Sequence, residues 1–308
     1  YKRQVTSEAI TISGLGDGIV AEANVDSNTT IIKNGAAVVG INTTVVDGDT
    51  IALRITSPGY GMTNNASITV GASSASWEVA SRNVPTIGIS SPSNAAYINS
   101  TSNLSSYAIG GSCSENGAVV TLKIENTIKA TPVCSASNWS TTIDAGLLPE
   151  GSLTILASQT SISGYVSSAT ANVVKDVTPP EIQSITTTNV SDSGFNVVLQ
   201  ASESSSLLVD YGVSVSYGGS ANGGSTGIAF TVPLSGLNAS TNYHYRVTVT
   251  DVAGNSTQSV DKLQKTATVI NGGTINSDTT WAASGSPYII KGNIRVMPSK
   301  TLTVEPGV

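Results

Sequence analysis

The chain has 308 residues, and its 14 Lys and Arg residues against 20 Asp and Glu residues give a net charge of −6. Because nucleic-acid binding needs clustered basic side chains that displace phosphate counterions, this composition excludes nucleic acid as a partner. Hydrophobic residues reach 39% and occur in alternating runs, while Ser, Thr, Asn, Gly and Val dominate. We therefore expect a folded, all-β chain without long helices.

The length suits two to four domains, and the turn and proline signals divide the chain into three domains and a shorter final segment. No aliphatic run approaches the ~20 residues of a bilayer-spanning helix, so no membrane span is expected in this chain. The sequence begins Tyr1-Lys2-Arg3, without Met or an apolar signal core. Either a signal has been removed or, as we favour, the chain belongs to a longer parent.

Residues 1–83 contain short alternating runs separated by turn signals. The turn sequence Asp47-Gly48-Asp49 precedes a strand in which Ile51, Leu53 and Ile55 share one face. Several short strands at regular spacing within about 100 residues are typical of an immunoglobulin-like (Ig-like) β-sandwich. The expected strands cover 9–12, 19–25, 50–56, 66–70 and 74–79.

Residues 84–177 repeat this pattern, with one predicted inward face on Val120, Leu122 and Ile124. A later strand places Leu153, Ile155 and Ala157 on one face in the same way. Pro85 at one end and Pro179-Pro180 at the other cannot donate to a central ladder, so they predict the boundaries of this domain. Short joints that contain proline are expected to restrict bending between domains.

The two cysteines, Cys113 and Cys134, are predicted to form a disulfide, because the segment between them holds one strand, a turn and the start of another strand. Closing such a loop stabilises a domain by roughly 3 kcal/mol in the chain-entropy model. Disulfides persist in oxidising compartments, so we expect an extracellular protein, secreted or on a bacterial cell surface.

Residues 178–268 contain a strictly alternating strand. Tyr243, Tyr245, Val247 and Val249 fall on one face, while His244 falls on the other. Tyr243 stands where a tyrosine corner is expected, with its hydroxyl returning to the backbone near Leu237. With this Leu and Tyr spacing, the segment resembles a fibronectin type III domain. The resemblance implies a third β-sandwich.

The first two domains resemble bacterial Ig-like repeats of large surface proteins. In the first domain the resemblance lies in the 47–54 run and in the strand around Trp77. In the second it lies in the segments around Cys113, around Cys134 and Trp139, and in Leu148-Pro-Glu-Gly151. This resemblance implies tandem modules that extend a surface protein.

Residues 269–308 break the sandwich pattern with a different set of short strands, among them the segments around Thr280-Trp281 and 286–293. The segment resembles the first coil of a right-handed parallel β-helix, in which each coil buries its face only against the next. A small terminal hairpin on the third sandwich is the alternative.

No catalytic residue is identified in the sequence. His244 is the only histidine, and it lies on the outward face of its strand, while no Gly-x-Ser-x-Gly motif surrounds a serine. One histidine and a paired set of cysteines leave no ordinary zinc site, so we expect no cofactor and no metal. Calcium is the least weak of the metal hypotheses, because the loops Asp47-Gly-Asp49 and Asp251-Val-Ala-Gly-Asn255 offer oxygen ligands. Both loops are also ordinary turn sequences.

Aromatic side chains that could bind a sugar are few. Trp77 and Trp139 lie in alternating strands and are interpreted as core or edge packing, and Tyr60 in a loop is the better exposed candidate. The sequence therefore favours a non-catalytic stalk or cell-surface binding module of a bacterial surface or secreted protein, with a glycan or protein as its expected ligand. The alternative is an accessory region of a secreted polysaccharide-degrading enzyme with a downstream β-helix.

Overall fold

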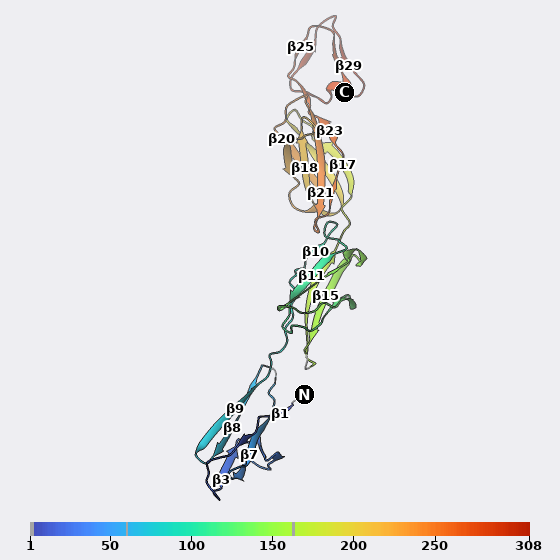
Figure 1. Ribbon diagram of the computed structural model, residues 1–308. Coiled ribbons are helices and arrows are strands. Elements are labelled where there is room, and N and C mark those ends of the chain that lie inside the picture. Colours follow the sequence, from blue (N-terminus) through green and yellow to red (C-terminus); the bar gives the residue numbers. More distant parts are fainter. Residues whose placement is uncertain (1–2, 60, 162–163) are drawn as a thin grey trace.

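The computed structural model describes residues 3–59, 61–161 and 164–308, so Tyr1, Lys2 and Tyr60 lie outside the described residues. Apart from the short 3-10 helices η1 (Ala145–Leu147) and η2 (Ala283–Gly285), the regular structure in these ranges is β-strand. The all-β prediction is confirmed. Figure 1 shows groups of β-strands that follow one another from the blue to the red end of the chain. The described helices include none that is long and apolar enough to cross a membrane.

The first sandwich packs a sheet of order β1-β7-β4-β5, with β2 also on β7, against a sheet of order β6-β3-β8-β9. Ile51, Leu53 and Ile55 are each at most 6% exposed, which confirms their predicted inward face. They pack with Ile31 and Ile68 in one core. The strands are β1 (Gln4–Thr6), β2 (Ile10–Thr11), β3 (Ala21–Val25), β4 (Thr29–Lys33), β5 (Ala36–Ala37), β6 (Asn42–Val45), β7 (Thr50–Thr56), β8 (Thr63–Val70) and β9 (Ser73–Ala80).

The second sandwich has a sheet of order β10-β16-β15-β12-β13 opposite the pair β11-β14. Its first strand, β10, pairs in parallel with its last strand, β16, and places Tyr97 beside Val174. Both predicted inward faces are buried: Val120, Leu122, Ile124, Leu153, Ile155 and Ala157. The strands are β10 (Tyr97–Ile98), β11 (Tyr107–Ser112), β12 (Val120–Ile124), β13 (Thr127–Ala130), β14 (Asn138–Ile143), β15 (Gly151–Thr160) and β16 (Val166–Lys175).

The third sandwich is organised by one long strand, β18, that belongs to both sheets. Its first half, from Gly194, pairs with β17 and β20, and its second half, up to Gly212, pairs with β19 and β21. This division is that of an Ig-like or fibronectin type III-like sandwich. The strands are β17 (Ile182–Thr188), β18 (Gly194–Gly212), β19 (Gly219–Asn222), β20 (Gly227–Ser235), β21 (Asn242–Asp251), β22 (Ser256–Gln258) and β23 (Lys262–Lys265).

The C-terminal segment, residues 268–308, contains short strands that pair in parallel. β24 pairs with β27, β25 with β28, and β26 with β29, so the second set of strands lies beside the first in the same order. Trp281 stacks on Tyr288, with ring centroids 5.3 Å apart. The strands are β24 (Thr268–Ile270), β25 (Gly273–Ile275), β26 (Thr279–Trp281), β27 (Tyr288–Ile290), β28 (Ile294–Val296) and β29 (Leu302–Val304).

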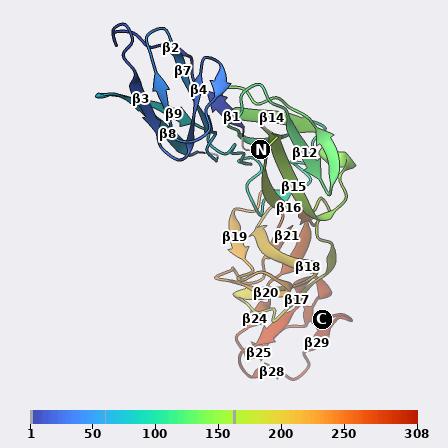
Figure 2. The same cartoon turned by 90° about the horizontal axis from the view of Figure 1, so that it is seen from below.

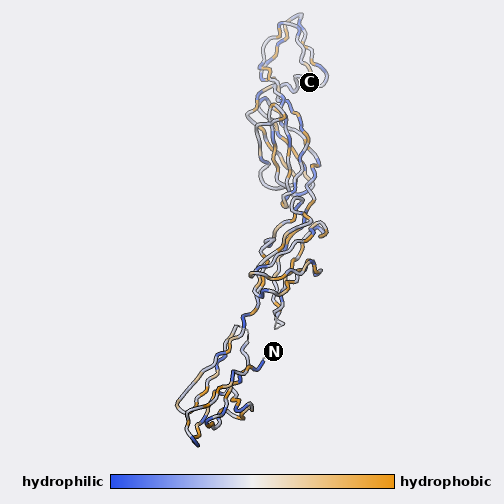
Figure 3. The backbone as a smooth tube through the Cα atoms, in the orientation of Figure 1, coloured by the Kyte–Doolittle hydropathy of each residue, from blue (hydrophilic) through white to orange (hydrophobic). Residues whose placement is uncertain are grey.

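Each sandwich has a core of its own. Among the described residues, the buried side chains form separate clusters centred on residues such as Ile31, Leu122 and Val247. Figure 3 shows hydrophobic stretches in the strands of each body instead of one continuous apolar region. Seen from below, the first sandwich lies to one side of the other two (Figure 2). Two joints connect these cores, the first joint around Pro85 and the second joint around Pro179-Pro180.

Candidate functional site at the second joint

The connection between β21 and β22 forms a tight turn that faces the second sandwich. Gly254 has a φ of +92°, a left-handed conformation that favours glycine, and its N–H donates to the carbonyl of Asp251 at 3.3 Å. The N–H of Asp251 donates to the carbonyl of Asn255 at 3.0 Å, which closes the hairpin. Residues 251–255 thus form a turn, as the second of the two interpretations of this sequence predicts.

Asn255 joins the second and third sandwiches. It is 1% exposed, its Oδ1 accepts from the N–H of Ser100 at 2.8 Å, and its Nδ2 donates to the carbonyl of Asp176 at 2.9 Å. The second Nδ2 hydrogen bonds Asp251 Oδ2 at 2.9 Å. Asn99 adds a further link, from its Nδ2 to the carbonyl of Ala253 at 2.8 Å. Both polar atoms of the Asn255 amide are thus hydrogen-bonded, and their partners come from both sandwiches.

A group of carboxylates lies beside this amide. Asp176, Glu203 and Asp251 each offer an oxygen atom, and these atoms all lie within 4.8 Å of one another. Burial raises the pKa of Glu203, and repulsion from Asp176 and Asp251 raises it further. The sequence points to Asp251 through its loop, but it gives no signal for Asp176 and Glu203, because no spacing relates the three residues. The one sequence feature that marks this region is the proline pair Pro179-Pro180, which predicts a domain boundary close to Asp176.

Oxygen atoms in this arrangement are the ligands that hard cations such as Ca²⁺ select, although Ca²⁺ takes six to eight of them. The other predicted calcium loop has a different use. Asp47 Oδ1 accepts from the N–H of Leu15 at 2.8 Å, while Asp49 pairs with Lys33 Nζ at 2.9 Å and accepts from Asn34 Nδ2 at 2.7 Å. The Asp47 and Asp49 carboxylates therefore serve separate hydrogen-bond sets within the first sandwich.

The first joint, residues 81–86, has far fewer links. Arg82 lies 3.7 Å from Glu115, with 76% of its side chain exposed. A cleft of about 730 Å³ opens beside this pair, and Asn116 and Ala118 contribute to its lining. Between the described residues of 3–80 and those of 84–177, no hydrogen bond crosses the joint.

His244 belongs to a hydrogen-bond chain on the third sandwich. Its Nδ1 lies 2.8 Å from Asp261 Oδ2, and the Tyr217 hydroxyl donates to the other oxygen of Asp261 at 3.1 Å. The His244 hydrogen bond is the main cause that lowers the pKa of Asp261. Arg246 covers the Tyr217 ring and pairs with Asp210 at 3.0 Å. A carboxylate thus contacts His244, and these hydrogen bonds connect β21 to the two loops that carry Tyr217 and Asp261.

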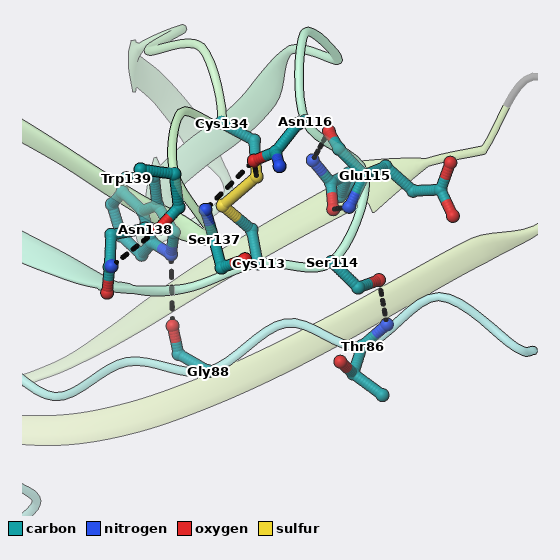
Figure 4. Close-up of a disulfide and its surroundings, with 12 residues drawn as sticks. Thr86, Gly88, Cys113, Ser114, Glu115, Asn116, Cys134, Ser137, Asn138 and Trp139 are labelled. Carbon is teal, nitrogen blue, oxygen red and sulfur yellow. Dashed lines mark hydrogen bonds between the residues drawn. A yellow bond between two sulfur atoms is a disulfide. The ribbon is translucent and has the colours of Figure 1, made fainter.

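Cys113 and Cys134 form the predicted disulfide (Figure 4). Next to it, Trp139 is 3% exposed and donates from Nε1 to the carbonyl of Gly88 at 3.0 Å, so its core interpretation is confirmed. Figure 4 also shows Asn116 above the bridge, accepting from the N–H of Ser137 at 2.9 Å. The disulfide and Trp139 therefore belong to the core of the second sandwich.

Tyr243 and Leu237 lie together at the edge of the third sandwich. Tyr243 is 7% exposed and Leu237 is 9% exposed, and both belong to its core. The Tyr243 hydroxyl accepts from the N–H of Asn238 at 3.0 Å. This contact reaches the backbone one residue after Leu237.

No protein-family model matches the chain, and no curated protein matches it. Among solved structures, titin domains A168–A170 are similar at 15% identity and a TM-score of 0.46, covering 86% of this chain and 94% of that chain. A structure from a 1.5-MDa bacterial ice-binding adhesin has 16% identity and a TM-score of 0.38, covering 84% and 88%. A tetra-tandem repeat from the extending region of a large adhesion protein has 16% identity and a TM-score of 0.29, covering 86% and 70%. The Ig-like and fibronectin type III-like arrangement of the sandwiches is seen in their strand pairing.

Proposed function

We propose that the chain is a non-catalytic extracellular stalk and binding module of a bacterial surface or secreted protein. The proposed modules are residues 1–83, 84–177 and 178–268, followed by 269–308. Separate cores support this division, because each sandwich buries its own apolar side chains. Length then comes from modules in series, and loops at the module ends are available to a glycan or protein ligand.

The observation that carries this proposal is the hydrogen-bonded second joint. Asn255 fixes the third sandwich to Ser100 and Asp176 of the second, so these two modules act as one stiff unit. A stalk needs such stiffness, because a freely jointed chain of modules would fold back on itself. Two further features add to the proposal, the disulfide and the contact of Tyr243 with the backbone.

The Cys113–Cys134 disulfide supports an oxidising, extracellular location. The contact of the Tyr243 hydroxyl with the backbone beside Leu237 supports a tyrosine corner, which would fix the turn into β21. Neither group is assigned a catalytic role. The disulfide stabilises the second sandwich, and the tyrosine corner would stabilise the third.

The parallel strand pairs of residues 268–308 support the start of a parallel β-helix. Thr268 pairs with Tyr288 and Thr279 pairs with Leu302, a repeat of about 20 residues that suits solenoid coils. The segment is anchored to the third sandwich, since Lys291 pairs with Asp192 and Lys265 Nζ donates to the carbonyl of Ser284 at 2.6 Å. These contacts would orient a solenoid along the axis of the stalk.

Small-angle X-ray scattering of the whole chain tests the stalk. We expect a maximum dimension close to that of the extended form in Figure 1 and a narrow distribution for the second and third sandwiches. A compact particle, with modules folded against one another, would contradict the proposal. Addition of chelator tests whether a bound cation contributes to the shape.

The parallel strand pairs also allow the second candidate, an accessory region of a secreted polysaccharide-degrading enzyme, because parallel β-helices carry lyases and hydrolases as well as adhesins. Binding to an immobilised panel of bacterial and host glycans and matrix proteins separates the two. Selective binding to host or bacterial surface ligands supports the stalk with a recognition module. Selective binding to one polysaccharide that a downstream enzyme would cleave supports the accessory region.

A further inference from the structure

Lys175, the last residue of β16, carries a buried ammonium group. It follows Ala171 and Val173 on the buried face of this strand, and it is itself only 4% exposed. The ion pairs between described residues do not include it. Because an ammonium group is costly to remove from water unless its N–H groups find acceptors, this position depends on a specific set of partners.

The partners are three backbone carbonyl groups in and after η1. Nζ of Lys175 donates to the carbonyl oxygens of Ala145 at 2.9 Å, Leu148 at 2.7 Å and Gly146 at 3.5 Å. An ammonium group has three N–H donors, so the three acceptors satisfy it. The last carbonyl groups of a helix lack partners within the helix, and a cation is favoured there. Lys175 therefore fixes η1 to the end of β16.

η1 in turn supports the loop that follows β10, residues 99–104. The N–H of Ala145 donates to the carbonyl of Leu104 at 3.0 Å. At the other end of the loop, Asn99 Oδ1 accepts from the N–H groups of Thr101 at 3.2 Å and Ser102 at 3.0 Å. The 99–104 loop is thus hydrogen-bonded within itself and also to η1.

This loop and the residue after Lys175 are the parts of the second sandwich that bind Asn255. Ser100 donates to its Oδ1, and the carbonyl of Asp176 accepts from its Nδ2. The N–H of Asp176 also donates to the carbonyl of Ile98 at 3.0 Å. The contacts form a closed ring, from Asn255 to residue 176, through Lys175 to η1, from η1 to the 99–104 loop, and back to Asn255.

We propose that Lys175 is a positioning residue of the second joint. Its ammonium group holds η1, and through η1 the 99–104 loop, where Ser100 and Asp176 both reach Asn255. The inference rests on the stiff joint of the proposed stalk, and it assigns part of that stiffness to a side chain whose own hydrogen bonds lie within the second sandwich. Coupling of this kind is reciprocal, so Asn255 should also keep Lys175 buried.

Acylation of lysine amines in the folded full chain, followed by mass spectrometry, tests this coupling without a change at Lys175. In the unmodified chain Lys175 should react at least tenfold more slowly than Lys129, an exposed residue of β13. Asn255→Leu should speed the acylation of Lys175 several-fold and leave the rates of Lys129 and Lys33 unchanged. Asn242→Leu, at an exposed position of β21, is the matched control. Equal Lys175 rates in the two variants would overturn the inference.

Lys175→Met tests the other direction, because it keeps a long unbranched side chain and removes the three donors. The distribution of distances between spin labels on β14 and β20 should broaden as it does in Asn255→Leu. The double variant should be no broader than the broader single variant, since both substitutions open the same ring. Lys123→Met, on β12 of the same sandwich, is the control and should leave the distribution unchanged.

A folded Lys175→Met chain with distances as narrow as those of Lys123→Met would contradict the role of Lys175. If Lys175→Met does not fold, the acylation rates decide. A distribution that is already broad in the unmodified chain would contradict the stiff joint itself, and with it the proposed stalk. A narrow distribution that does not respond to Lys175→Met would leave the stalk and remove only the role of Lys175.

Discussion

The two joints of the molecule are similar in sequence and different in contacts. Both contain proline, Pro85 at the first and Pro179-Pro180 at the second, and each proline fixes its own φ. The second joint adds Asn255, buried and bonded to both sandwiches, whereas the first has the exposed Arg82 near Glu115. A buried amide that is hydrogen-bonded through its oxygen and its nitrogen, more than the proline, distinguishes the contacts of the second joint from those of the first.

The largest effect is expected from reduction of the Cys113–Cys134 disulfide. Its 21-residue separation implies a loss of about 3 kcal/mol from the stability of the second sandwich. Because the second joint couples neighbours, the unfolding temperature of the third sandwich should fall with it, while that of the first should not. Calorimetry with and without reductant, and the Cys113→Ala, Cys134→Ala double variant, measures this.

Equal shifts of all transitions would show that the first joint is as coupled as the second. An isolated shift of the second sandwich would show that neither joint transmits stability. Either result would remove the contrast between the two joints.

The next effect concerns Asn255→Leu. The side chain of similar size leaves the N–H of Ser100, the carbonyl of Asp176 and the Asp251 carboxylate without their partner, at a cost of about 2 kcal/mol. The angle between the second and third sandwiches should also broaden. Distances between spin labels on β13 and β20 report that angle.

Asn242→Leu is the matched control for this variant, because Asn242 is an exposed residue at the start of β21 in the same sandwich. It should change neither the distance distribution nor the unfolding temperature. If Asn255→Leu also left the distances unchanged, the stiffness of the second joint would have another source.

Acid should weaken the first sandwich through Asp49. The hydrogen bond from Asn34, followed by the one from Lys33, lowers the pKa of Asp49 from 3.8 to about 2. A lowered folded pKa means that this stabilisation is present above the unfolded value and is lost as the pH falls from about 3.8 towards 2. Asp49→Asn should lower the unfolding temperature of the first sandwich at pH 7 and lessen its fall in acid.

Thermal scans between pH 7 and pH 2 measure this dependence, with Asp17→Asn, at an exposed loop position, as the control. The third sandwich should show the same pH dependence in the unmodified chain and in Asp49→Asn. A parallel change in the third sandwich would mean that the first joint transmits stability after all.

The smallest effect is expected from Arg82→Ala. An exposed ion pair contributes at most about 1 kcal/mol, and this one is long at 3.7 Å. The unfolding temperatures and the distribution of angles at the first joint should remain within error, as measured by calorimetry and spin-label distances. A marked broadening of the angles would assign to Arg82 the role that Asn255 has at the second joint.

Alternating strands could be predicted from the sequence, and contacts between modules could not. The faces of β7 and β21 follow directly from residues such as Leu53 and Val247. β4 was missed because its consecutive buried residues Ile31 and Ile32 break the alternation and turn residues flank it. The Asp176, Glu203 and Asp251 group was missed since its members come from distant segments that only the joint brings together.

The parallel pairing of β10 with β16 has a mechanical consequence. These are the first and last strands of the second sandwich, and Tyr97 and Ile98 lie in register with Val174 and Lys175. When tension pulls the two ends of the module apart, parallel neighbours slide in opposite directions. The hydrogen bonds between them are then loaded together in shear instead of opening one by one like a zipper, and the sandwich resists extension until they break at once.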